Sequence, residues 1–251
     1  MSHEPTIVLV HGAFADGSSW NGVVERLLQG GHHVVAPANP LRGLAADSAY
    51  IASYISQIDG PTILVGHSYG GAVISNAAST AKNVLGLVFV AAYAPENGET
   101  LGGAGANSKD SVLNSALVQR LYPTGKDGET APEFIVDPAK FHDAFASDVP
   151  EKQSAVMAAT QRPIAAGAFS EASGPPAWKT IPSWAVVAVG DKAAGTDVIR
   201  SMAKRAGAKA VEIKGSHVIM VSQPQAVTDV ILEAVQAVGK PVASAGLRNK
   251  P

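Results

Sequence analysis

The stretch Thr62-Ile-Leu-Val-Gly-His-Ser-Tyr-Gly-Gly71 decides the fold of this chain. Its first half is apolar and β-branched, which is typical of a buried strand. Its second half has the pattern Gly-x-Ser-x-Gly, in which a strand turns sharply into a helix and raises a serine hydroxyl above the sheet. Such a turn crowds the backbone, so Gly66 and Gly70 occupy positions that favour a small residue. The pattern predicts Ser68 as a nucleophile; the alternative is a serine that only caps the helix.

A serine nucleophile needs a base, and two of the seven histidines follow the Ser68 turn. His217 comes directly after the short strand-like run Val211-Glu-Ile213, on a Gly-Ser loop. In proteins with parallel sheets, binding and catalytic residues lie on such loops, at the carboxyl ends of the strands. His142 lies in an irregular, proline-rich region and is expected to be a surface residue or to pack within the predicted cap. We therefore expect His217 to be the general base.

The acid that orients this base should leave a strand between Ser68 and His217. The run Ser183-Trp-Ala-Val-Val-Ala-Val189 is the last long strand in that interval, and Asp191 is the first carboxylate beyond it. Asp197 is the competitor, but it is expected at the start of the next helix, where a negative charge stabilises the helix dipole. We predict that Asp191 holds the imidazole in its productive tautomer.

The remaining part of such a site is a pair of backbone amides that stabilise the oxyanion. One amide belongs to the residue after the nucleophile, Tyr69, and the other to the loop after the first strand. That loop reads His11-Gly-Ala-Phe14. Ala13 is the expected donor, with Phe14 as the adjacent alternative, while His11 is expected to be structural.

The rest of the chain alternates strand and helix patterns, which predicts a doubly wound, mostly parallel α/β sheet of about six strands. The expected strands cover residues 6–10, 33–37, 62–66, 85–92, 184–190 and 209–214. The expected helices cover residues 18–29, 46–58, 69–80, 196–206 and 224–238.

This alternation breaks between Ala94 and Pro182, where more than half of the prolines fall. Long interruptions of a regular α/β chain are usually functional. We predict a mainly helical cap over residues 95–182, with helical fragments at Ser111–Leu121 and Pro150–Thr160, inserted into a core formed by residues 1–94 and 183–238. Residues 239–251 are expected to be a frayed tail. We expect the bulky aromatic residues of the cap to pack in the core of the cap rather than to line the substrate pocket: Phe134, Phe141, Phe145 and Phe169.

Composition agrees with a globular enzyme and excludes several other classes. The 251 residues carry a formal net charge of −2, with 46% hydrophobic and 16% charged residues, so neither nucleic-acid binding nor disorder is indicated. No cysteine is present, which excludes disulfides and thiol chemistry. The sequence shows neither a signal peptide nor an apolar run of membrane-spanning length, so we expect a cytoplasmic protein without a membrane partner.

These motifs together resemble the α/β-hydrolase superfamily, in particular its branch of bacterial small-molecule esterases, plant methylesterases and hydroxynitrile lyases. The resemblance covers residues 5–238 and rests on four motifs: His11–Phe14, Gly66–Gly71, Gly190–Lys192 and Gly215–His217. It implies Ser68, Asp191 and His217 as the catalytic triad, a cap inserted before the strand that carries the acid, and no cofactor or metal. Relatives commonly continue with Ile-Pro after the Asp-Lys pair, whereas this chain has Ala193-Ala-Gly-Thr196.

Two positions separate esterases from lyases within this resemblance. The lyases have a threonine and a lysine where this chain has Gly12 and Val218. We therefore predict a serine esterase that hydrolyses small to medium carboxylic esters through an acyl-enzyme. The alternatives are a lactonase, amidase or thioesterase, a lyase or cofactor-free oxygenase on the same fold, and a ligand receptor with slow turnover. Phe14 and Val218 are expected to line the substrate site. The only expected partner is a small-molecule ester, and the oligomeric state stays open, with a dimer among the alternatives.

Overall fold

The central element of the fold is a six-stranded parallel sheet. The computed structural model describes residues 4–239, so the predicted tail at residues 240–251 lies outside it, as do residues 1–3. The strand order is β2-β1-β3-β4-β8-β9. The bounds of the strands are β1 Thr6–Val10, β2 Val34–Val35, β3 Thr62–His67, β4 Val84–Val90, β8 Ser183–Val189 and β9 Lys209–Lys214. This arrangement confirms the predicted fold class.

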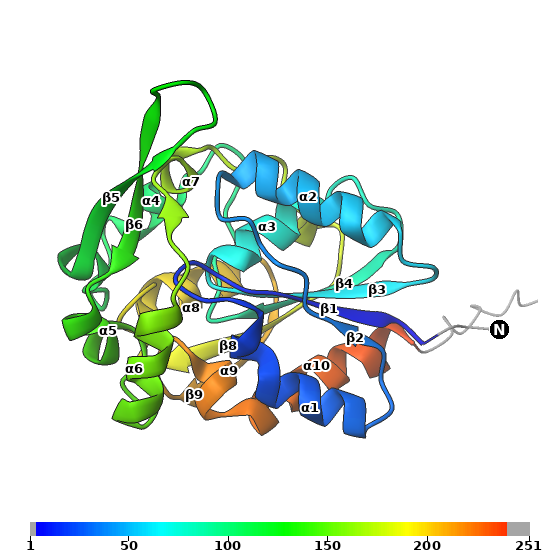
Figure 1. Ribbon diagram of the computed structural model, residues 1–251. Helices are drawn as coiled ribbons and strands as arrows, with labels where there is room; N and C mark the ends of the chain where they lie inside the picture. Colours follow the sequence, from blue (N-terminus) through cyan, green and yellow to red (C-terminus); the bar gives the residue numbers. More distant parts are fainter. Residues whose placement is uncertain (1–3, 240–251) are drawn as a thin grey trace, which may run out of the picture.

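Helices cover both faces of the sheet, which is why β1, β3 and β8 read as almost continuous apolar runs. In Figure 1, α2 and α3 lie over one face, while α1 and α10 lie over the other. The bounds of the core helices are α1 Asn21–Gln29, preceded by a 3₁₀ turn at Gly17–Trp20, α2 Leu44–Ser56, α3 Tyr69–Ala78, α8 Thr196–Arg205, α9 Ile219–Ser222 and α10 Pro224–Val238. None of the helices within residues 4–239 combines the length and apolar character that a membrane crossing requires.

The segment between β4 and β8, residues 91–182, interrupts this pattern and is called the inserted segment below. It lies at the carboxyl ends of the parallel strands, in green in Figure 1. It contains the helices α4 Leu101–Gly105, α5 Pro138–Phe145, α6 Glu151–Thr160 and α7 Gly167–Ser170, two 3₁₀ turns at Leu113–Ala116 and Ala177–Lys179, and the strands β5 Leu117–Pro123, β6 Thr130–Val136 and β7 Ile164–Ala165.

The predicted helix at Ser111–Leu121 is wrong, whereas the one at Pro150–Thr160 is confirmed as α6. Leu113, Leu117 and Leu121 are spaced by four residues, which imitates a helical stripe. In the structure the chain from Leu117 onward pairs antiparallel with β6 instead, and β7 completes a three-stranded sheet. β5 and β6 form a hairpin whose loop, residues 124–129, contains Gly125 and Gly128 with positive φ, whereas β7 joins the sheet from 28 or more positions further along.

The inserted segment is bound to the core through the loop before α2. The amide of Ala165 donates to the carbonyl of Leu41 at 2.9 Å, and Arg42 forms an ion pair with the nearly buried Glu133 at 2.7 Å. The Arg42 guanidinium also lies 4.5 Å from the centre of the Tyr122 ring, a cation–π arrangement. These contacts hold the antiparallel sheet beside the carboxyl ends of the core strands.

Candidate active site

Ser68 occupies a strained turn between β3 and α3. Its backbone angles are φ 53° and ψ −123°, a region that residues other than glycine rarely adopt. A Cβ at Gly66 would lie 2.5 Å from the carbonyl oxygen of Gly70, and a Cβ at Gly70 would clash with the carbonyl of Val10. Strain of this kind costs about 1–3 kcal/mol and is typical of functional positions. The turn therefore has the backbone geometry that the Gly-x-Ser-x-Gly pattern predicts.

The loop after β1 packs directly against this turn. A Cβ at Gly12 would lie 2.7 Å from Ser68 Cβ and 2.8 Å from the carbonyl oxygen of His67, so any larger residue would push the two segments apart. His11 is fully buried: its Nε2 accepts from the Asn39 amide at 2.9 Å, and its Nδ1 donates to the carbonyl of Gly12 at 3.0 Å. Burial lowers the pKa of His11, which agrees with its expected structural role.

Hydrogen bonding distinguishes the two candidate donors of the loop. The amide of Phe14 donates to the carbonyl of Arg162 at 3.2 Å. Among residues 4–239, the amides of Ala13 and Tyr69 have no hydrogen-bond partner. The lack of a side chain at Gly12 lets the two segments approach closely, and Ala13 and Tyr69, which carry these free amides, directly follow Gly12 and Ser68.

His217 and Asp191 are in direct contact at the ends of β9 and β8. His217 Nδ1 lies 2.7 Å from Asp191 Oδ2, and both side chains are at least 98% buried. The other carboxylate oxygen of Asp191 accepts hydrogen bonds from the amides of Ala193 and Ala194, at 2.9 and 3.0 Å. The Ala-Ala sequence that departs from the family pattern therefore supplies two backbone donors to this carboxylate.

Thr196 closes the loop that carries Asp191. Its buried hydroxyl accepts hydrogen bonds from the amides of Gly190 and Asp191, both at 3.1 Å. The same hydroxyl donates a hydrogen bond to the carbonyl of Ala188 at 2.8 Å. The carboxylate is thus oriented by backbone and hydroxyl groups from within its own loop. This role of Thr196 was not predicted, because in the sequence the residue only marks the start of a helix.

Asp197, the competing acid, contacts the inserted segment instead. Its carboxylate accepts from the Ser108 hydroxyl at 2.6 Å and from the Lys109 amide at 2.8 Å. Burial by itself raises the pKa of Asp197, but the bonds from Ser108, Lys109 and the amide of Val198 outweigh it and lower the pKa. Asp197 therefore joins α8 to the inserted segment, and it is Asp191 that contacts His217.

Two neighbours of His217 were not expected from the sequence. His67 Nε2 lies 2.9 Å from the carbonyl oxygen of His217 and must donate to it, since a carbonyl only accepts. Burial, and then the charge of His217, hold the pKa of His67 well below its usual range. Phe145 of the inserted segment meets the His217 ring edge-on, with centroids 4.9 Å apart. No local sequence signal points to either contact, because each joins residues far apart in the chain.

Ser68 itself is 6% exposed, and its hydroxyl makes no hydrogen bond to any residue from 4 to 239. Hydrogen bonds of catalytic groups are often long without substrate and shorten when substrate binds. His142, the competing histidine, lies on α5, and its Nδ1 makes no hydrogen bond to any residue from 4 to 239. The structure therefore joins the predicted acid and base directly and links the serine to them through its neighbour His67.

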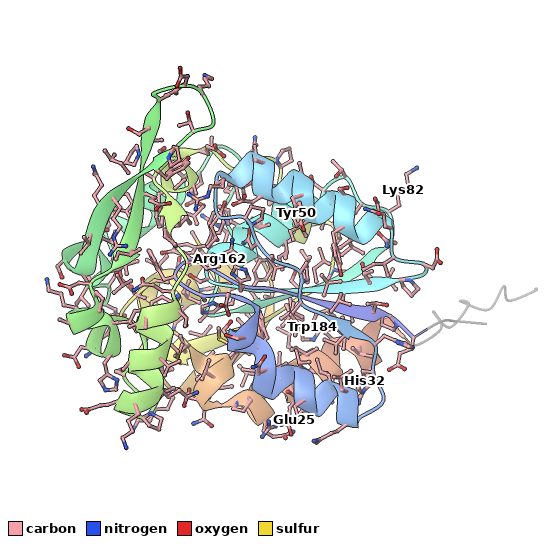
Figure 2. The ribbon with its side chains drawn as sticks, viewed as in Figure 1. Glu25, His32, Tyr50, Lys82, Arg162 and Trp184 are labelled. Carbon is pink, nitrogen blue, oxygen red and sulfur yellow. The ribbon has the colours of Figure 1, made fainter. Side chains whose placement is uncertain are left out.

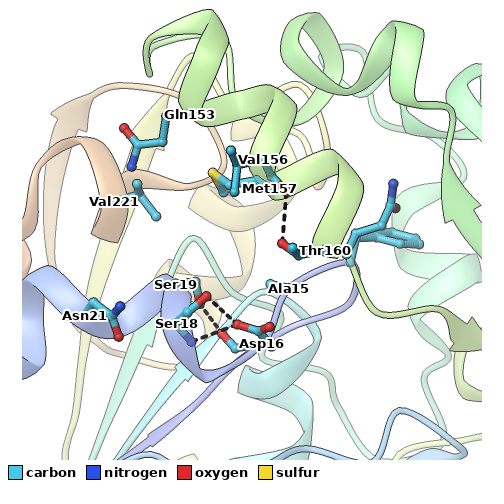
Figure 3. A pocket seen from close by; sticks show the side chains of 12 residues that line it. Ala15, Asp16, Ser18, Ser19, Asn21, Gln153, Val156, Met157, Thr160 and Val221 are labelled. Carbon is cyan, nitrogen blue, oxygen red and sulfur yellow. Dashed lines mark hydrogen bonds between the residues drawn. The ribbon is translucent and has the colours of Figure 1, made fainter.

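The other expected site residues have distinct surroundings. The Tyr69 hydroxyl donates to the fully buried Asp47 at 2.7 Å, and burial raises the pKa of both groups. Val218 is fully buried and directly precedes α9. Phe14 lines a pocket of about 180 Å³ between α6 and the turn before α1, where Val156, Met157 and Val221 face Asp16 and the two serines after it (Figure 3).

The inserted segment bonds to both loops of this site. The Ser111 hydroxyl donates to the carbonyl of Ala193 at 2.6 Å, next to Asp191. The Ser216 hydroxyl, adjacent to His217, donates to Asp148. Among the aromatic residues assigned to the core of this segment, Phe141 and Phe145 are fully buried, while Phe134 and Phe169 line a second cavity. The segment therefore contacts the loops of both Asp191 and His217.

Comparison with known proteins agrees with this geometry. The model of the alpha/beta hydrolase family matches residues 7–230. The chain belongs to this family. It is 34% identical over 107 residues to a carbendazim hydrolyzing esterase of Nocardioides sp. (strain SG-4G), a match that covers 38% of this chain and 44% of that esterase. The chain thus spans less than half the length of this curated relative.

Solved structures extend the likeness of fold to nearly the whole chain. Polyneuridine aldehyde esterase superposes with a TM-score of 0.77 at 19% identity, covering 92% of this chain and 99% of that one. A pyrethroid hydrolase from Sphingobium faniae JZ-2 superposes with a TM-score of 0.75 at 21% identity, covering 93% and 98%. Identities this low establish the shared fold.

Proposed function

We propose that this protein is a serine esterase that hydrolyses small to medium carboxylic esters through an acyl-enzyme, with Ser68, His217 and Asp191 as its triad. The observation that carries the proposal is the buried His217–Asp191 contact of 2.7 Å beside a serine with φ 53°, in a chain of the alpha/beta hydrolase family. The names of the similar proteins, which include esterases and a hydrolase, support the same reaction class.

In this mechanism the Ser68 hydroxyl attacks the acyl carbon while His217 Nε2 takes its proton. Asp191 holds the proton of Nδ1, which fixes the tautomer and stabilises the imidazolium as it forms. The free amides of Ala13 and Tyr69 receive the oxyanion, and each such donor typically contributes about 3–4 kcal/mol to the transition state. His217 then protonates the leaving alcohol, and water repeats the cycle to release the acid.

The surroundings of two residues favour hydrolysis over cyanohydrin cleavage. A Cβ at Gly12 would already lie 2.7 Å from Ser68 Cβ, so the threonine of the resembling lyases has no space here. Val218 is fully buried, and a lysine there would bury a charge. Both observations argue against a lyase. We further propose that residues 95–182 act as the cap of the site, because Phe145 covers His217.

The test is serine-directed labelling combined with ester turnover. Wild type should hydrolyse a chromogenic short-chain ester and become labelled by a fluorophosphonate. Ser68→Ala should lose both properties while keeping its unfolding midpoint. Ser79→Ala, which alters an exposed serine at the other end of the same helix, should keep both. An active Ser68→Ala variant, or a wild type that binds esters without turnover, would refute the proposal, the latter in favour of a receptor.

A further inference from the structure

A second cavity lies beside the loop of Asp191: all but one of its lining residues belong to the inserted segment, and the exception is Ala193 of the loop after β8. Its volume is about 180 Å³. Its walls are largely apolar, and two of their rings, Phe134 and Phe169, lie 6.3 Å apart with planes inclined by 59°. The wall also includes the apolar side chains of Leu101, Leu113, Leu117 and Ala193. A cavity of about 150 Å³ with such a lining is known to hold benzene, so this one has room for a single ring.

One polar group in this cavity has no partner, the hydroxyl of Tyr93. Tyr93 is 8% exposed, and its hydroxyl makes no hydrogen bond to any residue within the described part of the chain. A Cβ at Gly105, another wall residue, would lie 3.7 Å from that hydroxyl. The Ser111 hydroxyl already donates to Ala193, and Asn114 is exposed. Because the Tyr93 oxygen remains accessible to solvent, a ligand that enters the cavity can reach this hydroxyl and accept its hydrogen bond.

Tyr93 is suited to donate its proton rather than to lose it. Burial, and then the negative charge of Asp191, raise the pKa of Tyr93 above its ordinary value, so the hydroxyl stays protonated at neutral pH. A neutral phenol in an apolar wall selects ligands that offer a hydrogen-bond acceptor.

The cavity is joined to the candidate triad through the backbone. The amide of Tyr93 donates to the carbonyl of Ser68 at 3.1 Å. Ala193, which lines the cavity, donates its amide to Asp191 at 2.9 Å. Strands β3, β4 and β8 are neighbours in the sheet, so the residues that follow them meet at one edge.

We propose that this cavity binds one group of the ester substrate, an apolar ring or branched chain of similar size that carries a hydrogen-bond acceptor, and that the Tyr93 hydroxyl is the donor that selects it. This assignment rests on the proposed esterase function. It makes Tyr93 a specificity-determining residue, whereas the apolar wall supplies most of the affinity.

Two probes of equal shape test the donor. Acetophenone has a ring and a carbonyl acceptor, and cumene has the same heavy-atom framework without the acceptor. Calorimetric titration of the intact protein should show that Tyr93→Phe weakens acetophenone binding about 5- to 10-fold, the loss expected for one hydrogen bond, and leaves cumene binding within about twofold. Tyr50→Phe is the control, because Tyr50 is an exposed residue of α2 (Figure 2). Equal weakening of both probes, or of neither, would overturn the donor role.

A blocking variant tests the location. Gly105→Leu should fill the cavity beside Tyr93 and abolish the binding of both probes, and undiminished binding would place the site elsewhere. Acetophenone should also inhibit ester hydrolysis competitively; binding through Tyr93 without inhibition would show that the cavity is not a substrate subsite. Because binding is measured without turnover, an absence of esterase activity refutes the proposed function separately from these results.

Discussion

Replacing Thr196 by valine should weaken both the stability of the protein and its catalysis. Valine keeps the shape of the side chain but removes a hydroxyl that makes three hydrogen bonds, to the amides of Gly190 and Asp191 and to the carbonyl of Ala188. At about 1 kcal/mol each, their loss should lower the free energy of unfolding by about 3 kcal/mol. For a urea m-value of about 3 kcal/mol/M, the midpoint should fall by about 1 M.

The matched control is Thr228→Val. Thr228 is equally buried, but its hydroxyl makes one bond, to the carbonyl of Pro224, so its loss should cost about 1 kcal/mol or less. Thr196→Val should also reduce kcat/KM, by up to about 10²-fold if the Asp191 carboxylate shifts by about 1 Å, whereas Thr228→Val should not. If both variants lose equal stability and Thr196→Val keeps wild-type kcat/KM, the loop does not depend on this hydroxyl as argued.

Three further predictions follow from the same site. Asp191→Asn should lower kcat by about 10³–10⁴-fold, by analogy with serine proteases, while Asp197→Asn should change it little; the opposite ranking in steady-state assays would reassign the acid. Gly12→Ala should reduce kcat/KM about 10²-fold by displacing the oxyanion loop, whereas Gly17→Ala, whose Cβ would have ordinary contacts, should keep wild-type turnover. The pKa of His67 is lowered in the folded protein, so below pH about 6.5 only the unfolded chain takes up a proton at this residue. The free energy of unfolding should therefore fall on acidification by about 1.4 kcal/mol per pH unit on account of His67. Urea titrations at several pH values should show a shallower pH dependence for His67→Gln than for wild type.

The core of the fold could be predicted because its signals are local. The apolar run at residues 6–10 and the stripe at residues 224–238 match β1 and α10 without any shift in bounds. The turn at Ser68 was also readable, since its glycines are required where the backbone of the turn meets the backbone of the neighbouring loop. β9 also matches, and the ends of the other core elements differ by one or two residues, as at β2, β4 and α2, or by three, as at the start of α1.

The inserted segment could not be predicted in the same way. The hairpin of β5 and β6 has a local signal, Asp127-Gly128 in its loop, but the leucine spacing at residues 113–121 imitates a helix, and the pairing of β6 with β7 is not local. The same reason explains the missed neighbours of His217. His67 and Phe145 reach it from 150 and 72 positions away in the chain, and only the folded structure brings them together. The catalytic roles of Ser68, Asp191 and His217 stay predictions that the experiments above test.

The most direct test of the account is the capture of the acyl-enzyme. Wild type mixed with p-nitrophenyl acetate, quenched in acid within the first turnovers and digested, should yield one acetylated peptide, with the acetyl group on Ser68. Ser68→Ala treated in the same way should yield none. Acetylation of wild type at a different residue, or ester turnover with no acylated serine under conditions where deacylation is slow, would contradict the central claim that Ser68 is the nucleophile of a serine esterase.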